Sequence, residues 1–195
     1  FARWMRRPEG GPYGSMGNGS AMRVSPVAWV APDEQQALAL AKTSAEVTHN
    51  HPEGVLGAQV TVFAILQARS GKTPEQVERL IEGYFPEPYR FYRPLEQLQE
   101  QYEYSELCGE TVPEALTCVF SATSFEDAIR NAISIGGDSD TLACIAGSVA
   151  EAFFGVPEEF IQEARTRLTP DLATIIDRFD GETSSRSRRL SASTP

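Results

Sequence analysis

The sequence predicts an all-α fold with about eight or nine helices. Apolar residues recur at helical spacing along most of the chain, and proline, serine, threonine or aspartate stands at the start of several of these segments. Alternation with a period of two is nowhere sustained long enough to predict a strand. The length of 195 residues suits a domain that buries a core without support from disulfides or metals.

The N-terminal part begins with a predicted loop and continues as helices. Residues 1–20 contain five glycines and two prolines without a sustained period, which predicts a loop. A Pro-Asp start signal followed by helical apolar spacing predicts a helix over 33–49. Pro52 then starts a second helix, over 53–70. Because this second segment is apolar nearly all round, we expect it to be the central helix.

The middle of the chain contains a capping box and two shorter helices. Thr73 and Gln76 form a capping-box pattern, which predicts a helix to about Tyr84. Residues 85–92 contain prolines that prevent a regular helix, so we expect a surface excursion there. The next predicted elements are a short amphipathic helix over 94–104 and a buried helix over 113–121 with proline in its first turn.

The C-terminal part alternates helices with short breaks. Ser124 starts a predicted helix to about Ile135. After Gly136 and Gly137, a helix over 140–154 is rich in small residues that permit close packing. The last two predicted helices cover 157–168 and 170–179. The final fifteen residues cannot bury enough surface to fold. The expected organisation is a helical domain over 1–180 and a disordered tail over 181–195.

Charge and cysteine content exclude several classes of protein. The chain has 17 Lys plus Arg against 27 Asp plus Glu, a net charge of −10, which disfavours binding to nucleic-acid phosphates. Three widely spaced cysteines argue against a disulfide framework and favour a reducing, cytoplasmic setting. The longest apolar stretch is too short to cross a bilayer, and no signal peptide is evident. The sequence does not indicate an oligomeric state.

A double glycine followed by acidic and hydroxyl residues forms the sharpest candidate site. Asp138, Asp140 and Thr141 offer the oxygens that hard divalent cations prefer, and the glycines allow the tight turn needed to aim them. An ordinary helix N-cap is the alternative, because aspartate before a helix caps it and interacts favourably with its dipole. Spacing alone leaves both interpretations open.

Two further segments are weaker candidates. The glycine-rich stretch 14–20 resembles loops that expose backbone N–H groups to a phosphate, with Ser15 or Ser20 adding a hydroxyl, although a flexible loop has the same pattern. His49 and His51 are the two histidines of the chain. Since further zinc ligands are not available nearby, hydrogen bonding to a ligand or to a buried carbonyl is favoured over metal binding.

Three motifs occur in a fixed order along the chain. They are GNGSAMRVSPVA, then THNHPEGVLGA, and near the C-terminus SIGGDSDTLACIAGSVAEAFFG. Together they resemble the ADP-ribosylglycohydrolase family, which includes the enzyme that removes ADP-ribose from dinitrogenase reductase. The resemblance extends over 11–179, and its most specific part is the GGDSDT element followed by a small-residue helix.

The resemblance implies a fold, a cofactor, a reaction and a set of site residues. The family fold is an orthogonal bundle of helices around two Mg²⁺ ions, or Mn²⁺ in some members. The reaction is hydrolysis of the glycosidic bond of ADP-ribosyl groups on proteins or small molecules. The implied metal ligands, whose two aspartates are also the catalytic candidates, are Asp138, Asp140 and Thr141. The implied contacts to ADP-ribose are Gly14, Ser15, Met16, Gly17, Asn18, Gly19 and His49.

The family pattern also contains an acidic first helix and a Thr-Asp-Asp-Thr element upstream of the glycine-rich loop, whereas this chain has no Asp-Asp pair. Two expectations follow. In the first, the chain is the C-terminal portion of a magnesium-dependent hydrolase and lacks the N-terminal third of the pattern. In the second, it is a catalytically inactive member that binds ADP-ribose or serves a structural role, because half of the metal site is missing. A different metal-dependent phosphohydrolase is a weaker third interpretation.

Overall fold

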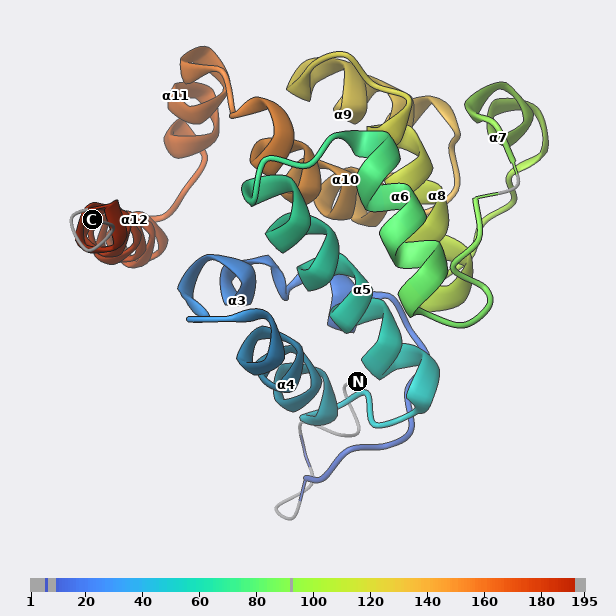
Figure 1. Ribbon diagram of the computed structural model, residues 1–195, viewed down its shortest axis with the longest axis horizontal. Helices are drawn as coiled ribbons and strands as arrows, with labels where there is room; N and C mark the ends of the chain where they lie inside the picture. Colours follow the sequence, from blue (N-terminus) through green and yellow to red (C-terminus); the bar gives the residue numbers. More distant parts are fainter. Residues whose placement is uncertain (1–5, 7–9, 92, 192–195) are drawn as a thin grey trace. The chain divides into compact units, whose positions relative to one another are not determined.

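A computed structural model describes residues 6, 10–91 and 93–191 of the chain, with the backbone alone for 184–191. Within these residues it contains eleven helices, α2 to α12, and no strand, which confirms the predicted all-α fold (Figure 1). The predicted loop over 1–20 lies partly outside the described residues. The chain divides into two units, Phe1–Gly155 and Val156–Pro195.

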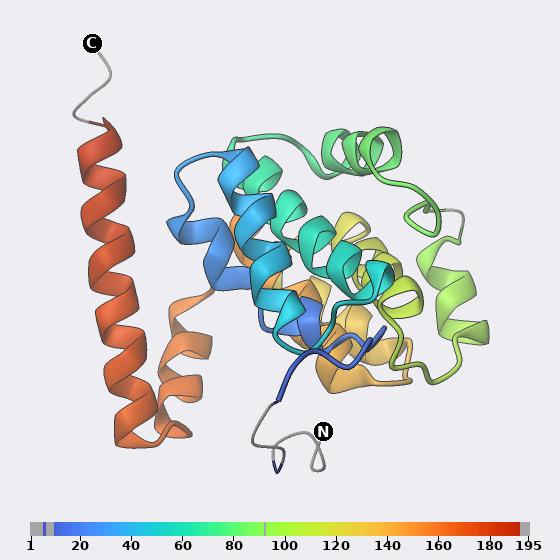
Figure 2. The same ribbon diagram turned by 90° about the horizontal axis from the view of Figure 1, so that it is seen from below.

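The first unit contains the helices α2 to α10, which pack against one another (Figure 2). Their bounds are α2 Gly19–Met22, α3 Ser25–Val30, α4 Glu34–Glu46, α5 Pro52–Arg69, α6 Pro74–Tyr84, α7 Leu95–Gln101, α8 Cys108–Phe120, α9 Phe125–Ser134 and α10 Ser139–Phe154.

The helix starts that the sequence predicts are formed by side-chain caps. Asp33 accepts a hydrogen bond from the backbone N–H of Gln36 at the start of α4. At the start of α6 the capping box is complete, since Thr73 Oγ1 accepts from Gln76 N while Gln76 Oε1 accepts from Thr73 N. At the start of α9, Ser124 Oγ accepts a hydrogen bond from the backbone N–H of Asp127. Local sequence therefore positions these three starts, because each cap satisfies N–H groups that the helix leaves unpaired.

Helix α5 is the central helix of the first unit, as predicted. Twelve of its eighteen residues are buried, and it contacts α2, α3, α4, α6, α8 and α10. Gly57 permits the approach of α8, since a Cβ there would lie 2.4 Å from Cys108 Sγ. Despite the apolar character of α5, no helix in the described part of the chain is long and apolar enough to cross a membrane.

Two features of the first unit differ from the prediction. The short helices α2 and α3 were not expected, because neither is long enough to show helical periodicity. Helix α8 begins at Cys108 rather than near Pro113, which lies inside the helix. The reason is tertiary: the residues that start α8 pair with the glycine-rich segment, and this contact fixes a helical turn ahead of the proline.

The segment after α6 is non-helical, as predicted, but it is not a surface excursion throughout. Phe85 is 5% exposed and Tyr89 is fully buried. The ring of Phe85 lies 5.3 Å from that of Phe63 in α5 and 6.3 Å from that of Tyr89, centroid to centroid. Aromatic burial therefore draws this irregular segment into the core. Tyr92, at the end of the predicted segment, lies outside the described residues.

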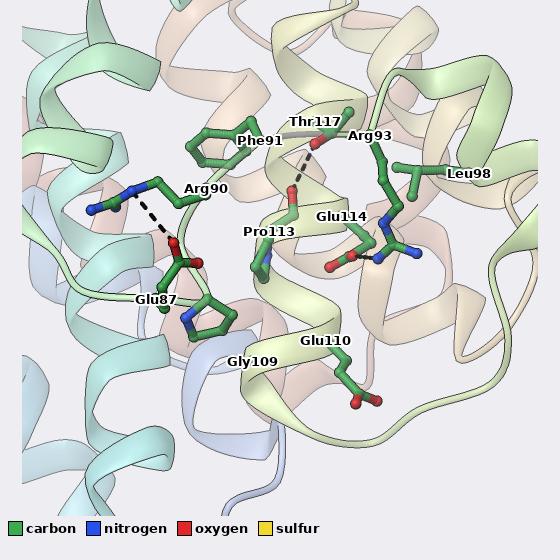
Figure 3. Close-up of a pocket in the computed structure, with 11 residues that line it drawn as sticks. Glu87, Arg90, Phe91, Arg93, Leu98, Gly109, Glu110, Pro113, Glu114 and Thr117 are labelled. Atoms are coloured by element: carbon green, nitrogen blue, oxygen red, sulfur yellow. Dashed lines mark hydrogen bonds and ion pairs between the residues drawn. The ribbon is translucent and has the colours of Figure 1, made fainter.

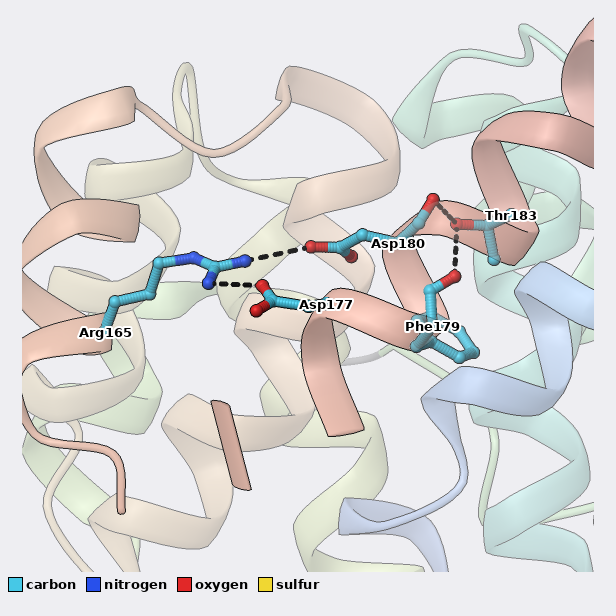
Figure 4. Close-up of polar contacts among 5 residues, drawn as sticks. All are labelled: Arg165, Asp177, Phe179, Asp180 and Thr183. Atoms are coloured by element: carbon cyan, nitrogen blue, oxygen red, sulfur yellow. Dashed lines mark hydrogen bonds and ion pairs between the residues drawn. The ribbon is translucent and has the colours of Figure 1, made fainter. Parts of the chain in front are cut away.

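The second unit consists of α11 Glu158–Thr166 and α12 Pro170–Ser191. Arg165 of α11 joins the two helices, because its guanidinium contacts Asp177 at 2.7 Å and Asp180 at 3.2 Å (Figure 4). These aspartates are three residues apart on α12, so both face the same side of the helix. Thr183 Oγ1 donates to the Phe179 carbonyl one turn earlier.

Helix α12 extends past its predicted end near residue 179 and continues to Ser191. The sequence predicted a disordered tail from 181 because these residues are too polar to be buried. A helix, however, satisfies its own backbone hydrogen bonds, and Ser and Arg side chains do not prevent helix formation. The remaining part of the predicted tail, 192–195, lies outside the described residues.

Candidate functional site

The glycine-rich segment pairs with the residues that lead into α8. Asn18 N donates to the Glu106 carbonyl at 2.7 Å, and Cys108 N donates to the Met16 carbonyl at 2.9 Å. Between these two hydrogen bonds, Gly17 and Leu107 form an isolated antiparallel bridge. The segment is therefore held as a short strand-like edge, and its side chains are presented at fixed positions.

The side chain of Asn18 joins the glycine-rich segment to the acidic element. Its Nδ2 donates to Asp138 Oδ2 at 2.7 Å and contacts Thr111 Oγ1 at 3.3 Å. Asn18 is 7% exposed, and its hydrogen bond to Thr111 is buried while the one to Asp138 is partly buried. Two of the three sequence motifs thus meet in one place, more than one hundred positions apart in the chain.

The double glycine before Asp138 forms the turn that its sequence predicts. Gly136 and Gly137 have φ angles of +76° and +66°, a region that favours glycine. The ring of Tyr102 lies directly over Gly137, since a Cβ there would come 2.4 Å from Tyr102 Cε1. Asp138 occupies the N-cap position of α10 without making a side-chain cap hydrogen bond. Its carboxylate is instead held by Asn18, so capping does not explain this residue.

The predicted metal ligands lie together at the start of α10. Asp140 is exposed, and its Oδ1 accepts a hydrogen bond from Thr141 N at 2.9 Å, whereas Thr141 is buried. The pKa of Tyr104 is raised to about 12, first by its hydrogen bond to Glu106 and then by burial. The negative charges of Asp138 and Asp140 contribute to the same shift.

This donor set fits part of a magnesium site. Two carboxylates and a hydroxyl are oxygen ligands of the type that a hard divalent cation prefers. Asp138 retains one carboxylate oxygen beyond its bond to Asn18, and the exposed Asp140 is accessible from solvent. In the described part of the chain no group of three or more His, Cys, Asp or Glu gathers around a metal position. These residues would therefore supply some, but not all, of the six ligands that Mg²⁺ takes.

His49 faces the glycine-rich segment from the other side. It is buried, and a Cβ at Gly19 would lie 3.4 Å from its Nε2 and one at Gly17 would lie 3.6 Å from it. Its Nδ1 is 2.6 Å from Thr48 Oγ1. Burial, and then the positive charge of Arg23, lower the pKa of His49. His49 therefore lies beside the glycine-rich segment, while its implied contact to ADP-ribose stays a prediction.

Several backbone N–H groups of the loop are engaged within the protein. Gly14 N donates to Asn50 Oδ1 at 2.7 Å, and Gly17 N donates to Ser15 Oγ at 3.2 Å. With Asn18 N bonded to Glu106, three of the amides expected to cradle a phosphate instead fix the shape of the loop. Met16 contributes its carbonyl to the start of α8. These three amides are therefore already hydrogen-bonded within the protein.

The second histidine of the motif has a structural role. His51 is the N-cap of α5, and its Nδ1 accepts a hydrogen bond from Glu53 N at 3.2 Å. The next contact, from Gly109 N to Glu53 Oε1 at 3.0 Å, ties the start of α5 to α8. The two histidines thus have different surroundings: His49 lies beside the glycine-rich loop, and His51 caps α5.

Sequence reasoning missed Thr111, Tyr102 and Tyr104 at this site. Thr111 is buried, contacts Asn18, and donates to the Ser105 carbonyl at 3.3 Å. Burial, and then the charge of Glu114, raise the pKa of Tyr102 to about 12. No motif marks Thr111 or Tyr102, because they reach the site only where α8 and the residue after α7 lie beside Asn18 and Gly137.

A separate cavity of about 370 Å³ lies between α8 and the segment before α7 (Figure 3). Its central feature is Glu114, which pairs with Arg93 through one carboxylate oxygen. The other oxygen, Oε2, is buried without a hydrogen-bond partner in the described structure. Burial outweighs the attraction of Arg93 and raises the pKa of Glu114 to about 7. None of the predicted site residues lines this cavity.

Comparison with known proteins gives one consistent family. The family model described as ADP-ribosylglycohydrolase matches residues 1–189. The human ADP-ribosylhydrolase ARH3 is 28% identical over 76% of this chain and 54% of its own length. The ADP-ribosyl-[dinitrogen reductase] glycohydrolase of Rhodospirillum rubrum is 29% identical over 75% of this chain and 50% of its own length.

The fold is also shared with solved structures. A chain titled as an ADP-ribosylglycohydrolase-related protein complex matches with a TM-score of 0.65 and 24% identity, over 83% of this chain and 60% of that one. This likeness supports the predicted type of helical bundle. The chain spans about half the length of the curated relatives it matches.

Proposed function

Because the chain belongs to the ADP-ribosylglycohydrolase family, we propose that it contributes to hydrolysis of the glycosidic bond between ADP-ribose and a protein or small-molecule acceptor. The observation that carries this proposal is the hydrogen bond from Asn18 to Asp138. It brings the loop that would contact ADP-ribose and the acidic element that would hold a metal into one site.

The proposal includes a divalent cation, Mg²⁺ or Mn²⁺. Asp138, Asp140 and Thr141 are the residues that would hold it, together with ligands from elsewhere. When bound, such an ion orients sugar hydroxyls and makes water a better nucleophile. Asn18 serves this arrangement by fixing one oxygen of Asp138 and leaving the other available.

The remaining residues of the site would position the substrate. The glycine-rich loop, held rigid by Glu106, Asn50 and Ser15, forms a narrow edge against which a diphosphate and a ribose can lie. His49 flanks this edge with its imidazole. Fixing the sugar relative to the acidic element is valuable because hydrolysis at the anomeric carbon depends on precise orientation.

The test measures release of ADP-ribose from an ADP-ribosylated protein, in the presence of Mg²⁺ and after addition of EDTA. Asp138→Asn and Asp140→Asn are each expected to reduce release by at least about a hundredfold, and EDTA should abolish it. Asp33→Asn is the matched control, since asparagine also caps the start of α4 well. Activity that persists in EDTA and in both site variants would refute the proposal.

A second candidate is a member of the family that binds ADP-ribose without hydrolysing it. The observation that favours it is the small set of acidic ligands in the described part of the chain. Calorimetry with ADP-ribose separates the two candidates: binding without release of ADP-ribose from any substrate supports the second, whereas turnover excludes it.

A further inference from the structure

Thr48 links the guanidinium of Arg23 to the imidazole of His49. Arg23 Nη2 lies 3.0 Å from Thr48 Oγ1, which in turn lies 2.6 Å from His49 Nδ1. Thr48 is 5% exposed and His49 is 7% exposed, so water does not compete freely for these groups. Three side chains therefore form one hydrogen-bonded row that ends at the glycine-rich loop.

The direction of each hydrogen bond in the row follows from the chemistry of the donors. A guanidinium has N–H donors and no acceptor, so Thr48 Oγ1 must accept from Arg23. In the described part of the chain, the recorded partners of Thr48 Oγ1 are Arg23 and His49. The single hydroxyl hydrogen of Thr48 is thus directed to His49 Nδ1, which must then be unprotonated. The opposite assignment leaves a buried hydroxyl hydrogen without an acceptor.

We propose that Arg23 and Thr48 are positioning residues that hold His49 as the neutral tautomer with its proton on Nε2. This nitrogen faces the loop, near Gly17 and Gly19. An N–H group in this position donates to an oxygen of the bound molecule, such as a phosphoryl or hydroxyl oxygen of a nucleoside diphosphate sugar. The identity of that molecule rests on the proposed function, whereas the tautomer does not.

Two further observations support a fixed, neutral imidazole. The Arg23 guanidinium also donates to the carbonyls of Gly19 and Ser44, each at 3.1 Å, so its position is set by both the loop and the end of α4. Burial and the adjacent Arg23 charge both disfavour the imidazolium form of His49. A neutral donor results, whose direction does not change with small changes of pH near neutrality.

The chain carries an internal reference for the experiment. His51 is the other histidine, and its Nδ1 accepts from the backbone N–H of Glu53 at 3.2 Å. This bond also requires the tautomer with the proton on Nε2, but it does not involve Thr48. Changes at Thr48 should therefore alter the spectrum of His49 and leave that of His51 unchanged.

The test is a two-bond ¹H–¹⁵N correlation spectrum of the full chain labelled at histidine, which distinguishes the two neutral tautomers directly. A His51→Gln variant assigns the signals. We expect the Nε2–H pattern for His49 in the unmodified protein and in Thr48→Ser, and a mixture of tautomers in Thr48→Val. An Nδ1–H pattern for His49 in the unmodified protein would overturn the proposal, and this outcome does not depend on any Thr48 variant. An unchanged pattern in a folded Thr48→Val would also overturn it.

Titration with ADP-ribose extends the test to the ligand. Thr48→Val should weaken binding about tenfold, while Thr48→Ser stays within about twofold of the unmodified protein. Equal binding by both variants would show that the tautomer does not serve the ligand. If the unmodified protein shows the expected tautomer but binds no ADP-ribose, the proposed function fails and the assignment of His49 stands.

Discussion

The side-chain amide of Asn18 donates a 2.7 Å hydrogen bond to Oδ2 of Asp138, across 120 positions of sequence. The same amide contacts Thr111 of α8, so one residue touches both the turn before α10 and the helix beside it. An amide suits this position because it provides two N–H donors without a charge. The arrangement leads to predictions about the site and about the packing around it.

Asn18→Asp should damage both the fold and the site. The change removes both N–H donors and places a second carboxylate against Asp138, so we expect the free energy of unfolding to fall by about 1–3 kcal/mol. Binding of ADP-ribose, measured by calorimetry, should weaken at least about tenfold. Asn131→Asp is the control, because Asn131 Nδ2 donates to the Cys118 carbonyl away from the site. Its effect should be confined to stability; an equal loss of binding would contradict the role given to Asn18.

Gly137→Ala should destabilise the protein more than Gly136→Ala. Both glycines have positive φ, so alanine costs about 1–2 kcal/mol at either position. Only at Gly137 would the new methyl group also collide, 2.4 Å from Tyr102 Cε1, whereas nothing lies within 4 Å at Gly136. The collision should add about 1–3 kcal/mol in urea denaturation. Replacing Tyr102 by Ala should recover this added part; equal costs for the two single variants would refute the packing.

Gly54→Ala should displace the glycine-rich loop, because Gly54 lies against Ser15 of that loop. A Cβ at Gly54 would lie 2.6 Å from the Ser15 carbonyl oxygen and 3.0 Å from His49 Cβ, so loop and histidine must both shift. We expect a loss of about 1–3 kcal/mol in stability and weaker binding of ADP-ribose. Gly83→Ala, in the exposed part of α6 with nothing within 4 Å, should instead stabilise by up to about 1 kcal/mol. Unchanged binding in Gly54→Ala would count against the loop as a ligand contact.

Glu114 should make the stability of the protein depend on pH. Its pKa is raised from 4.5 to about 7, chiefly by burial, so the folded state holds the proton more tightly than the unfolded state. The free energy of unfolding should therefore fall as the pH rises from about 4.5 to about 7, by up to about 3 kcal/mol. Glu114→Gln removes this titration and should flatten the profile measured by urea denaturation. The control Glu100→Gln, at an exposed position of α7, should keep the slope of the unmodified protein.

Much of the fold could be predicted from local patterns. The starts of α4, α6 and α9 depend on a cap within three residues of the helix, and the central position of α5 follows from its apolar surface. The start of α8 and the burial of Tyr89 could not be predicted in this way. Both depend on contacts with segments far away in the sequence.

The helical class and the three motifs could be recognised from the amino-acid sequence alone. Spacing alone left open whether Asp138 caps a helix or binds a metal, and the resemblance implied a ligand contact for His49 but gave no role to His51. The partners of these side chains are set by the tertiary structure: Asp138 accepts a hydrogen bond from Asn18, His51 caps α5, and His49 contacts Thr48. The physical reason is distance along the chain. Helices form through hydrogen bonds between residues four apart, whereas the site forms between segments that only the packing of a shared core brings together.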